Sequence, residues 1–141
     1  MRRTWQGGGF GRPQANCPVF DLAGRFVGTP DQLDVRAGVY GLYDGALHLA
    51  GAVRHGDVAK EAAYRALGLE GVTMMAGDLL DREPFVMRLR EAYARAERRS
   101  SNDRRWLPGL PRWWTPTFSV DQRRALSAYQ KSRLLRYRQA S

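Results

Sequence analysis

Tryptophan and arginine are interleaved in one segment toward the end of the chain. The segment contains Trp106, Trp113 and Trp114 together with Arg104, Arg105 and Arg112. Indole rings offer flat faces for base stacking and guanidinium groups hold phosphates, so this composition is typical of single-strand binders. Three nearby prolines also fit an extended strap that buries apolar area over a core. A third interpretation is an anchor into a partner protein.

Positive charge is concentrated in the last 60 residues. Residues 82–141 carry fifteen Lys and Arg against five Asp and Glu, whereas residues 1–81 carry eight against nine. Ser119 and Gln122 form a capping-box pattern, which predicts a single helix to about Tyr137. The cations of that segment are Arg123, Arg124, Lys131, Arg133, Arg136 and Arg138. Such a one-sided field attracts polyanions, so we expect nucleic acid, either DNA or RNA, as the partner. A solvated charged face is the simpler alternative.

Turn and capping signals predict the elements that position these residues. They indicate a hairpin over 17–27, a hairpin over 35–53 that turns at Asp44-Gly45, a helix over 58–67, a strand over 72–76 and a helix over 84–99. The expected fold class is α+β, with a small three-stranded antiparallel sheet flanked by helices in the order ββαβα. The expected divisions are a flexible arm over 1–16, a core over 17–103, a Trp/Pro-rich strap over 104–118 and the basic helix over 119–141.

Within this order, residues 38–102 resemble the GIY-YIG nuclease domain. Gly38-Val39-Tyr40 matches the first strand motif of that family, and Leu49-Ala50-Gly51 falls at the second motif without its tyrosine. His48 is the polar ring beside that gap. The family's helix arginine falls near Ala59, with Lys60 as the nearest cation. Glu91 and Asn102 have suitable spacing for the family's glutamate and asparagine.

The resemblance implies metal-dependent phosphodiester hydrolysis. Glu91 would hold Mg²⁺, Tyr40 or His48 would help to deprotonate water, and Lys60 would replace the arginine. Because two key positions are substituted, we expect a catalytically degenerate core.

Each of these residues also has a structural interpretation. Glu91 fits an i,i+4 pair with Arg95, His48 fits a hydrogen-bonded sheet residue, and Tyr40 and Tyr43 fit the two faces of a hairpin. Asp78 and Asp81 fit helix caps, although two carboxylates at this spacing also suit a cation.

Composition excludes several classes of protein. The lone Cys17 and two histidines offer no structural zinc site, and no stretch has the roughly 18 apolar residues of a membrane span. The first residues lack a signal-peptide core, so we expect an intracellular, cytoplasmic protein, or one carried in a virion. The leading hypothesis is a nucleic-acid-binding protein. The alternative is a structural or assembly protein of a virus particle or ribonucleoprotein, whose tails dock onto neighbouring chains.

Overall fold

The computed structural model describes residues 1–44, 51–100, 103–107, 109–117 and 119–136, with the backbone alone for 51–57 and 135–136. The chain divides into two compact units, Met1–Pro111 and Arg112–Ser141. None of the helices in the described parts has the length and apolar character that a bilayer span requires.

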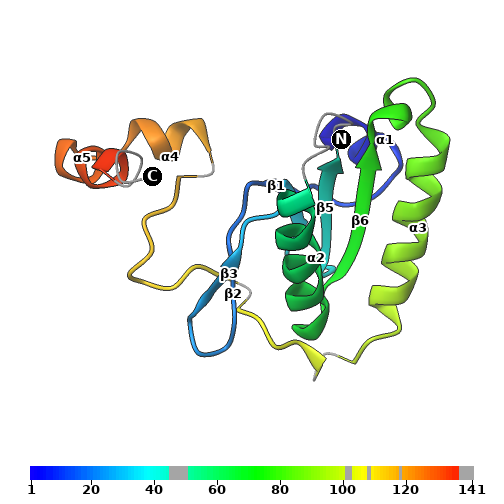
Figure 1. Ribbon diagram of the computed structural model, residues 1–141, viewed down its shortest axis with the longest axis horizontal. Coiled ribbons are helices and arrows are strands. Elements are labelled where there is room, and N and C mark those ends of the chain that lie inside the picture. Colours follow the sequence, from blue (N-terminus) through cyan, green and yellow to red (C-terminus); the bar gives the residue numbers. More distant parts are fainter. Residues whose placement is uncertain (45–50, 101–102, 108, 118, 137–141) are drawn as a thin grey trace. The chain divides into compact units, whose positions relative to one another are not determined.

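A mixed four-stranded sheet with the strand order β1-β4-β5-β6 lies at the centre of the first unit (Figure 1). Its strands are β1 (Gln14–Ala15), β4 (Gln32–Asp34), β5 (Val39–Asp44) and β6 (Glu70–Met75). β5 pairs antiparallel with β4 and parallel with β6. A separate antiparallel hairpin joins β2 (Val19–Phe20) to β3 (Phe26–Gly28), as predicted for 17–27. The α+β class is therefore confirmed, but the sheet is neither three-stranded nor wholly antiparallel.

β5 forms a hairpin with β4, the strand that precedes it, whereas the sequence predicted a hairpin with the segment that follows Asp44-Gly45. The Asp34 carboxylate accepts the backbone N–H groups of Arg36 and Ala37, both at 3.0 Å, and Gly38 adopts a φ of +72°. An acidic side chain that binds the following N–H groups closes a turn without an Asp-Gly pair. The order ββαβα does occur, but β4 is its first strand. The predicted partner strand at 46–50 lies outside the described residues.

Both helices predicted for the core are present. α2 (Gly51–Ala66) joins β5 to β6 as a crossover, which explains why these two strands run parallel. Gly68, with a φ of +85°, follows its last turn. After the 3₁₀ turn η1 (Ala76–Leu79), α3 (Glu83–Glu97) begins with Pro84 in its first turn.

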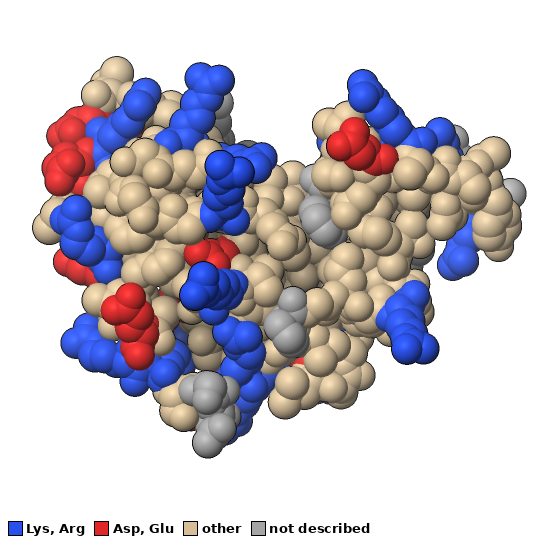
Figure 2. All heavy atoms as spheres, turned by 180° about the vertical axis from the view of Figure 1, so that it is seen from behind, with Lys and Arg blue, Asp and Glu red and all other residues tan. Residues whose placement is uncertain are grey.

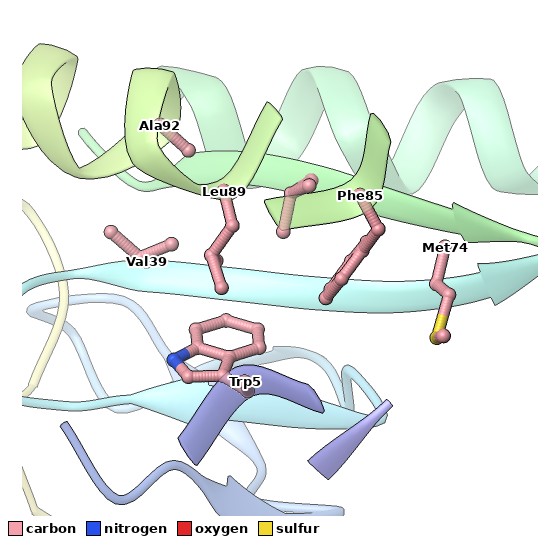
Figure 3. Packing of buried hydrophobic residues seen from close by; sticks show 7 residues of the cluster. Trp5, Val39, Met74, Phe85, Leu89 and Ala92 are labelled. Atoms are coloured by element: carbon pink, nitrogen blue, oxygen red, sulfur yellow. The ribbon is translucent and has the colours of Figure 1, made fainter. Parts of the chain in front are cut away.

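Successive β5 residues contribute to different core clusters, because strand side chains alternate between faces. Val39 belongs to a cluster with Phe85 and Leu89 of α3, whose side chains converge in Figure 3. Tyr40 belongs to a second cluster with Tyr64 of α2 and Trp106. α3 and α2 therefore pack on opposite faces of the sheet.

The prediction of a flexible N-terminal arm is wrong for part of its length. α1 (Arg2–Gly7) carries Trp5, which is fully buried in the cluster that includes Val39. The indole packs over Gly41, where a Cβ would lie 2.7 Å from the ring. Residues Gln14 and Ala15 also pair with β4. Tertiary packing has overridden the glycine-rich local sequence.

The described residues of the second unit form two short helices instead of the single helix predicted. α4 (Val120–Arg124) begins with the predicted capping box, in which the Gln122 N–H donates to Ser119 Oγ at 3.1 Å. A second box starts α5 (Ala128–Arg136): the Gln130 N–H donates to Ser127 Oγ at 3.2 Å, and the Ser127 N–H donates to Gln130 Oε1 at 2.9 Å. The repeated cap interrupts the expected continuous helix.

Candidate functional site

Tyr40 lines a cavity of about 430 Å³ beside β6. Its ring contacts that of Tyr64, with centroids 4.7 Å apart. The polar side chains of the cavity are those of Tyr40, Glu61, Arg65, Glu70, Thr73 and Arg95. We call this cavity the Tyr40 pocket. It presents a phenol, a threonine hydroxyl and paired charges, a combination that suits a small polar ligand.

Burial raises the pKa of Tyr40 to about 12, with Glu61 raising it further and Arg65 opposing the rise. The phenol is therefore neutral at pH 7, so it can donate a hydrogen bond but is not poised to deprotonate water. On the basis of the sequence, Tyr40 was expected as a candidate base. The raised pKa disfavours that role, because the phenolate is rarer at pH 7 than in a free tyrosine.

Glu70 is tied to two arginines of α3 and its flanking turn. Its carboxylate accepts Arg95 Nε at 3.0 Å and Arg99 Nε at 2.8 Å. Burial by itself would raise the pKa of Glu70, but the hydrogen bonds from Arg95 and Arg99 outweigh it and hold the pKa below its usual value. These charges therefore stabilise the junction of β6 and α3.

Glu91, the predicted metal ligand, is not brought to Tyr40. It lies on α3, which packs on the other face of the sheet and contributes only Arg95 to the Tyr40 pocket. The Glu91 side chain is 67% exposed and does not line that pocket. Its carboxylate is 4.0 Å from Arg95, which is the i,i+4 pair considered from the sequence. The described residues contain no group of three or more His, Cys, Asp or Glu that could hold a metal ion. Among the described residues, Glu91 is therefore not part of such a group.

The remaining predicted catalytic residues do not complete the constellation. Lys60 is exposed on α2 and does not line the Tyr40 pocket, and His48 lies outside the described residues. Glu61 and Arg65, which the sequence reasoning missed, lie there instead. Glu61 and Arg65 are four residues apart on α2, so they lie on one face of that helix. This helical spacing was the signal in the sequence that could have identified them.

The Trp/Pro-rich segment is divided by the boundary between the two units. Trp106 is 2% exposed and forms an isolated bridge with Asp21, so this residue does act as a strap over the core. The Arg104 guanidinium lies 4.8 Å from the centroid of the Trp106 ring and donates to the Arg36 carbonyl at 3.1 Å. Arg105 is exposed. Trp113 differs from Trp106, because 64% of its surface is exposed.

Asp34 anchors a second cavity, of about 520 Å³, in the first unit. Its carboxylate accepts the Tyr93 hydroxyl at 2.6 Å. Tyr93 and Trp106 contribute to the lining, and Arg36, Arg99 and Arg104 are among its charged residues. Because Asp34 and Arg99 are engaged in fold-stabilising contacts, this cavity is mainly a structural junction.

The second unit carries most of the excess charge. It has seven Lys and Arg against the single acid Asp121, a net of +6, whereas residues 1–111 have sixteen against thirteen. On the face shown in Figure 2, Lys and Arg visibly outnumber Asp and Glu.

The predicted cations of this unit are accessible wherever their side chains are described. Arg112, Arg123, Arg124, Lys131 and Arg133 are exposed. Arg123 donates to the Thr117 carbonyl at 2.9 Å. The backbone of Arg136 lies in α5, and Arg138 lies outside the described residues.

No protein-family model, no curated protein and no solved structure matches the chain. The resemblance to GIY-YIG nucleases therefore rests on residues 38–102 of this sequence alone.

Proposed function

We propose that the chain binds nucleic acid and that residues 112–141 make the principal phosphate contacts. The observation that carries this proposal is the charge of that segment, which has seven Lys and Arg against one acid. Phosphate backbones bind such surfaces by releasing condensed counterions. In the first unit, by contrast, several arginines are neutralised by acids.

Those neutralised arginines support the assignment to the second unit. Arg88 pairs with Asp78, and Arg95 and Arg99 pair with Glu70. Within the part of the chain that the structure describes, no acidic side chain forms a salt bridge with Arg124, Lys131 or Arg133. A cation without an acidic partner attracts a phosphate more strongly than a cation whose charge is neutralised by a salt bridge.

We also propose that the core is catalytically degenerate, with its GIY-YIG-like part acting as a scaffold. Support comes from the separation of Tyr40 and Glu91 onto different faces of the sheet. The raised pKa of Tyr40, about 12, supports the same conclusion, because a phenol of that pKa is a poor base at pH 7.

The test of nucleic-acid binding is a salt titration of affinity for short oligonucleotides. Changing Arg123, Arg124, Arg133 and Arg136 to Gln should weaken binding and reduce the slope of log affinity against log salt by about 3. A matched variant, with Arg2, Arg3, Arg82 and Arg90 changed to Gln, removes equal charge from the first unit. Equal effects of the two variants, or affinity that ignores salt, would contradict the proposal.

An assembly role is the second candidate, and one observation favours it. The second unit exposes large apolar side chains, including Val120 at 51% and Leu134 at 45%. Such residues suit burial by another chain. Binding to a protein that is lost on Val120→Ser and Leu134→Ser, with oligonucleotide affinity unchanged, would favour this candidate.

A further inference from the structure

The second unit exposes its aromatic rings as well as its cations. Trp113 is 64% exposed and Tyr129 is 71% exposed. Tyr129 lies on α5 four residues before Arg133, a spacing that puts the two on the same helical face. Arg112 immediately precedes Trp113. Each exposed ring therefore has a guanidinium group as a close neighbour along the chain.

This unit has no buried side chain among the described residues from 112 to 134. Its helices have five and nine residues, and helices this short are marginal in water without tertiary packing. The capping boxes satisfy backbone N–H groups at each helix start but bury no apolar area. Among its described residues, the unit therefore has exposed rings and capped helix starts but no buried side chain of the kind that normally stabilises short helices.

We propose that Trp113 and Tyr129 stack on the bases of single-stranded nucleic acid while neighbouring arginines hold its phosphates. This inference rests on the function proposed above and specifies the class of nucleic acid. Every base has a π-face, so stacking favours single strands without demanding a sequence. In a duplex those faces are covered by neighbouring base pairs, and exposing them costs a few kcal/mol per step.

The composition of α5 favours single-stranded nucleic acid over an anionic membrane surface. Helices that lie in a membrane interface carry a broad apolar face opposite their cations. The sequence of α5 has only three large apolar or aromatic residues among nine: Tyr129, Leu134 and Leu135. Rings interspersed with arginine fit a chain of alternating bases and phosphates better.

The experiment measures affinity of the full chain for oligo-dT, oligo-rU and a duplex, each about 15 units long, to span one binding site. The test variant is Trp113→Ala with Tyr129→Ala. Leu134→Ala is the matched control, because it removes exposed apolar surface without removing a ring. A third variant, Trp113→Phe with Tyr129→Phe, keeps both rings.

The alanine pair should weaken binding of at least one single strand by about 5-fold to 150-fold for each ring that stacks. Duplex affinity should change little, and both Leu134→Ala and the phenylalanine pair should stay close to the unchanged protein. Loss for oligo-dT alone, oligo-rU alone, or both would identify the strand that is bound. Intrinsic fluorescence should also be quenched by the bound strand, since Trp5 and Trp106 are buried and Trp113 is exposed.

Other outcomes overturn the stacking proposal and can be told apart from failure of nucleic-acid binding. If the arginine-to-glutamine variant weakens all oligonucleotides but the alanine pair weakens none, stacking is wrong and phosphate binding stands. If neither set changes affinity, both proposals fail. Equal losses for duplex and single strands would overturn stacking. Preferential binding to phosphatidylserine vesicles that depends on Leu134 would overturn it in favour of a membrane surface.

Discussion

Trp5 donates its indole N–H to the Tyr93 hydroxyl at 2.9 Å, across 88 residues of sequence. Tyr93 in turn donates to the buried Asp34 carboxylate at 2.6 Å. Phe10 stacks on the Tyr93 ring, with centroids 4.7 Å apart. The N-terminal segment is thereby joined to α3 and to the β4–β5 turn through one network.

Trp5→Ala should lower the free energy of unfolding by about 3 to 5 kcal/mol, because it empties a fully packed site. Urea denaturation followed by far-UV circular dichroism measures the change. Trp113→Ala is the control, since that exposed ring should alter stability by no more than about 0.5 kcal/mol. Equal stability of the Trp5 variant and the unchanged protein would mean that the N-terminal segment is not part of the core.

Gly71→Ala should destabilise the first unit by about 1 to 3 kcal/mol, because the new methyl group would overlap the Tyr40 hydroxyl. Adding Tyr40→Phe removes that hydroxyl and should restore part of the loss. Gly77→Ala is a suitable control, since nothing lies within 4 Å of its added Cβ. Thermal and urea unfolding are compared for the unchanged protein, Gly71→Ala, Tyr40→Phe, the double variant and the Gly77→Ala control, to test the geometry of the Tyr40 pocket. Strictly additive single effects would contradict the predicted clash.

Glu70 should make stability depend on acid pH. Its pKa in the fold lies below the reference value of 4.5, so its contribution is fully present above about pH 4.5. That contribution is lost as pH falls through the lower pKa of the folded state, where the carboxylate becomes protonated. Glu70→Gln should therefore flatten the loss of stability between about pH 5 and 3. Glu91→Gln, at an exposed position, should leave the profile nearly unchanged, and identical profiles for all three proteins would refute the assignment.

Purified protein should show no strong cleavage of nucleic acid with Mg²⁺ or Mn²⁺. Leu49 and Ala59 stand where the resembled family places a tyrosine and an arginine, and each such loss typically costs about 10² to 10³ in rate. Nicking of a supercoiled plasmid measures the activity. Metal-dependent cleavage that disappears in Glu91→Gln, with Tyr40→Phe lowering the rate but not the affinity, would overturn the degenerate-core proposal.

Local signals in the sequence were sufficient for several elements. Pro84 and Gly68 marked the start of one helix and the end of another, and Ser119 with Gln122 marked the start of α4. The β4–β5 turn was missed because a side chain, that of Asp34, closes it. Trp5 was missed because its burial depends on residues that lie far away in the sequence.

The candidate site was harder to predict than the elements. Tyr40 was identified, but the resemblance directed attention to Lys60 when Glu61 and Arg65 line the pocket. Glu91 had suitable spacing in the sequence, yet its helix packs on the opposite face of the sheet from Tyr40. Spacing along a chain does not determine which face of a sheet a helix covers. The position of Glu91 relative to Tyr40 could therefore be found only from the three-dimensional structure.

Both core clusters take their buried residues from the stretch between Trp5 and Trp106. The unit with the larger net charge, Arg112–Ser141, begins after both clusters end. Substitutions at the cations of residues 112–134 therefore leave both core clusters untouched, because none of the cluster residues lies in that stretch. The net charge of the second unit can therefore be changed by substitution without altering the packing of the core of the first unit.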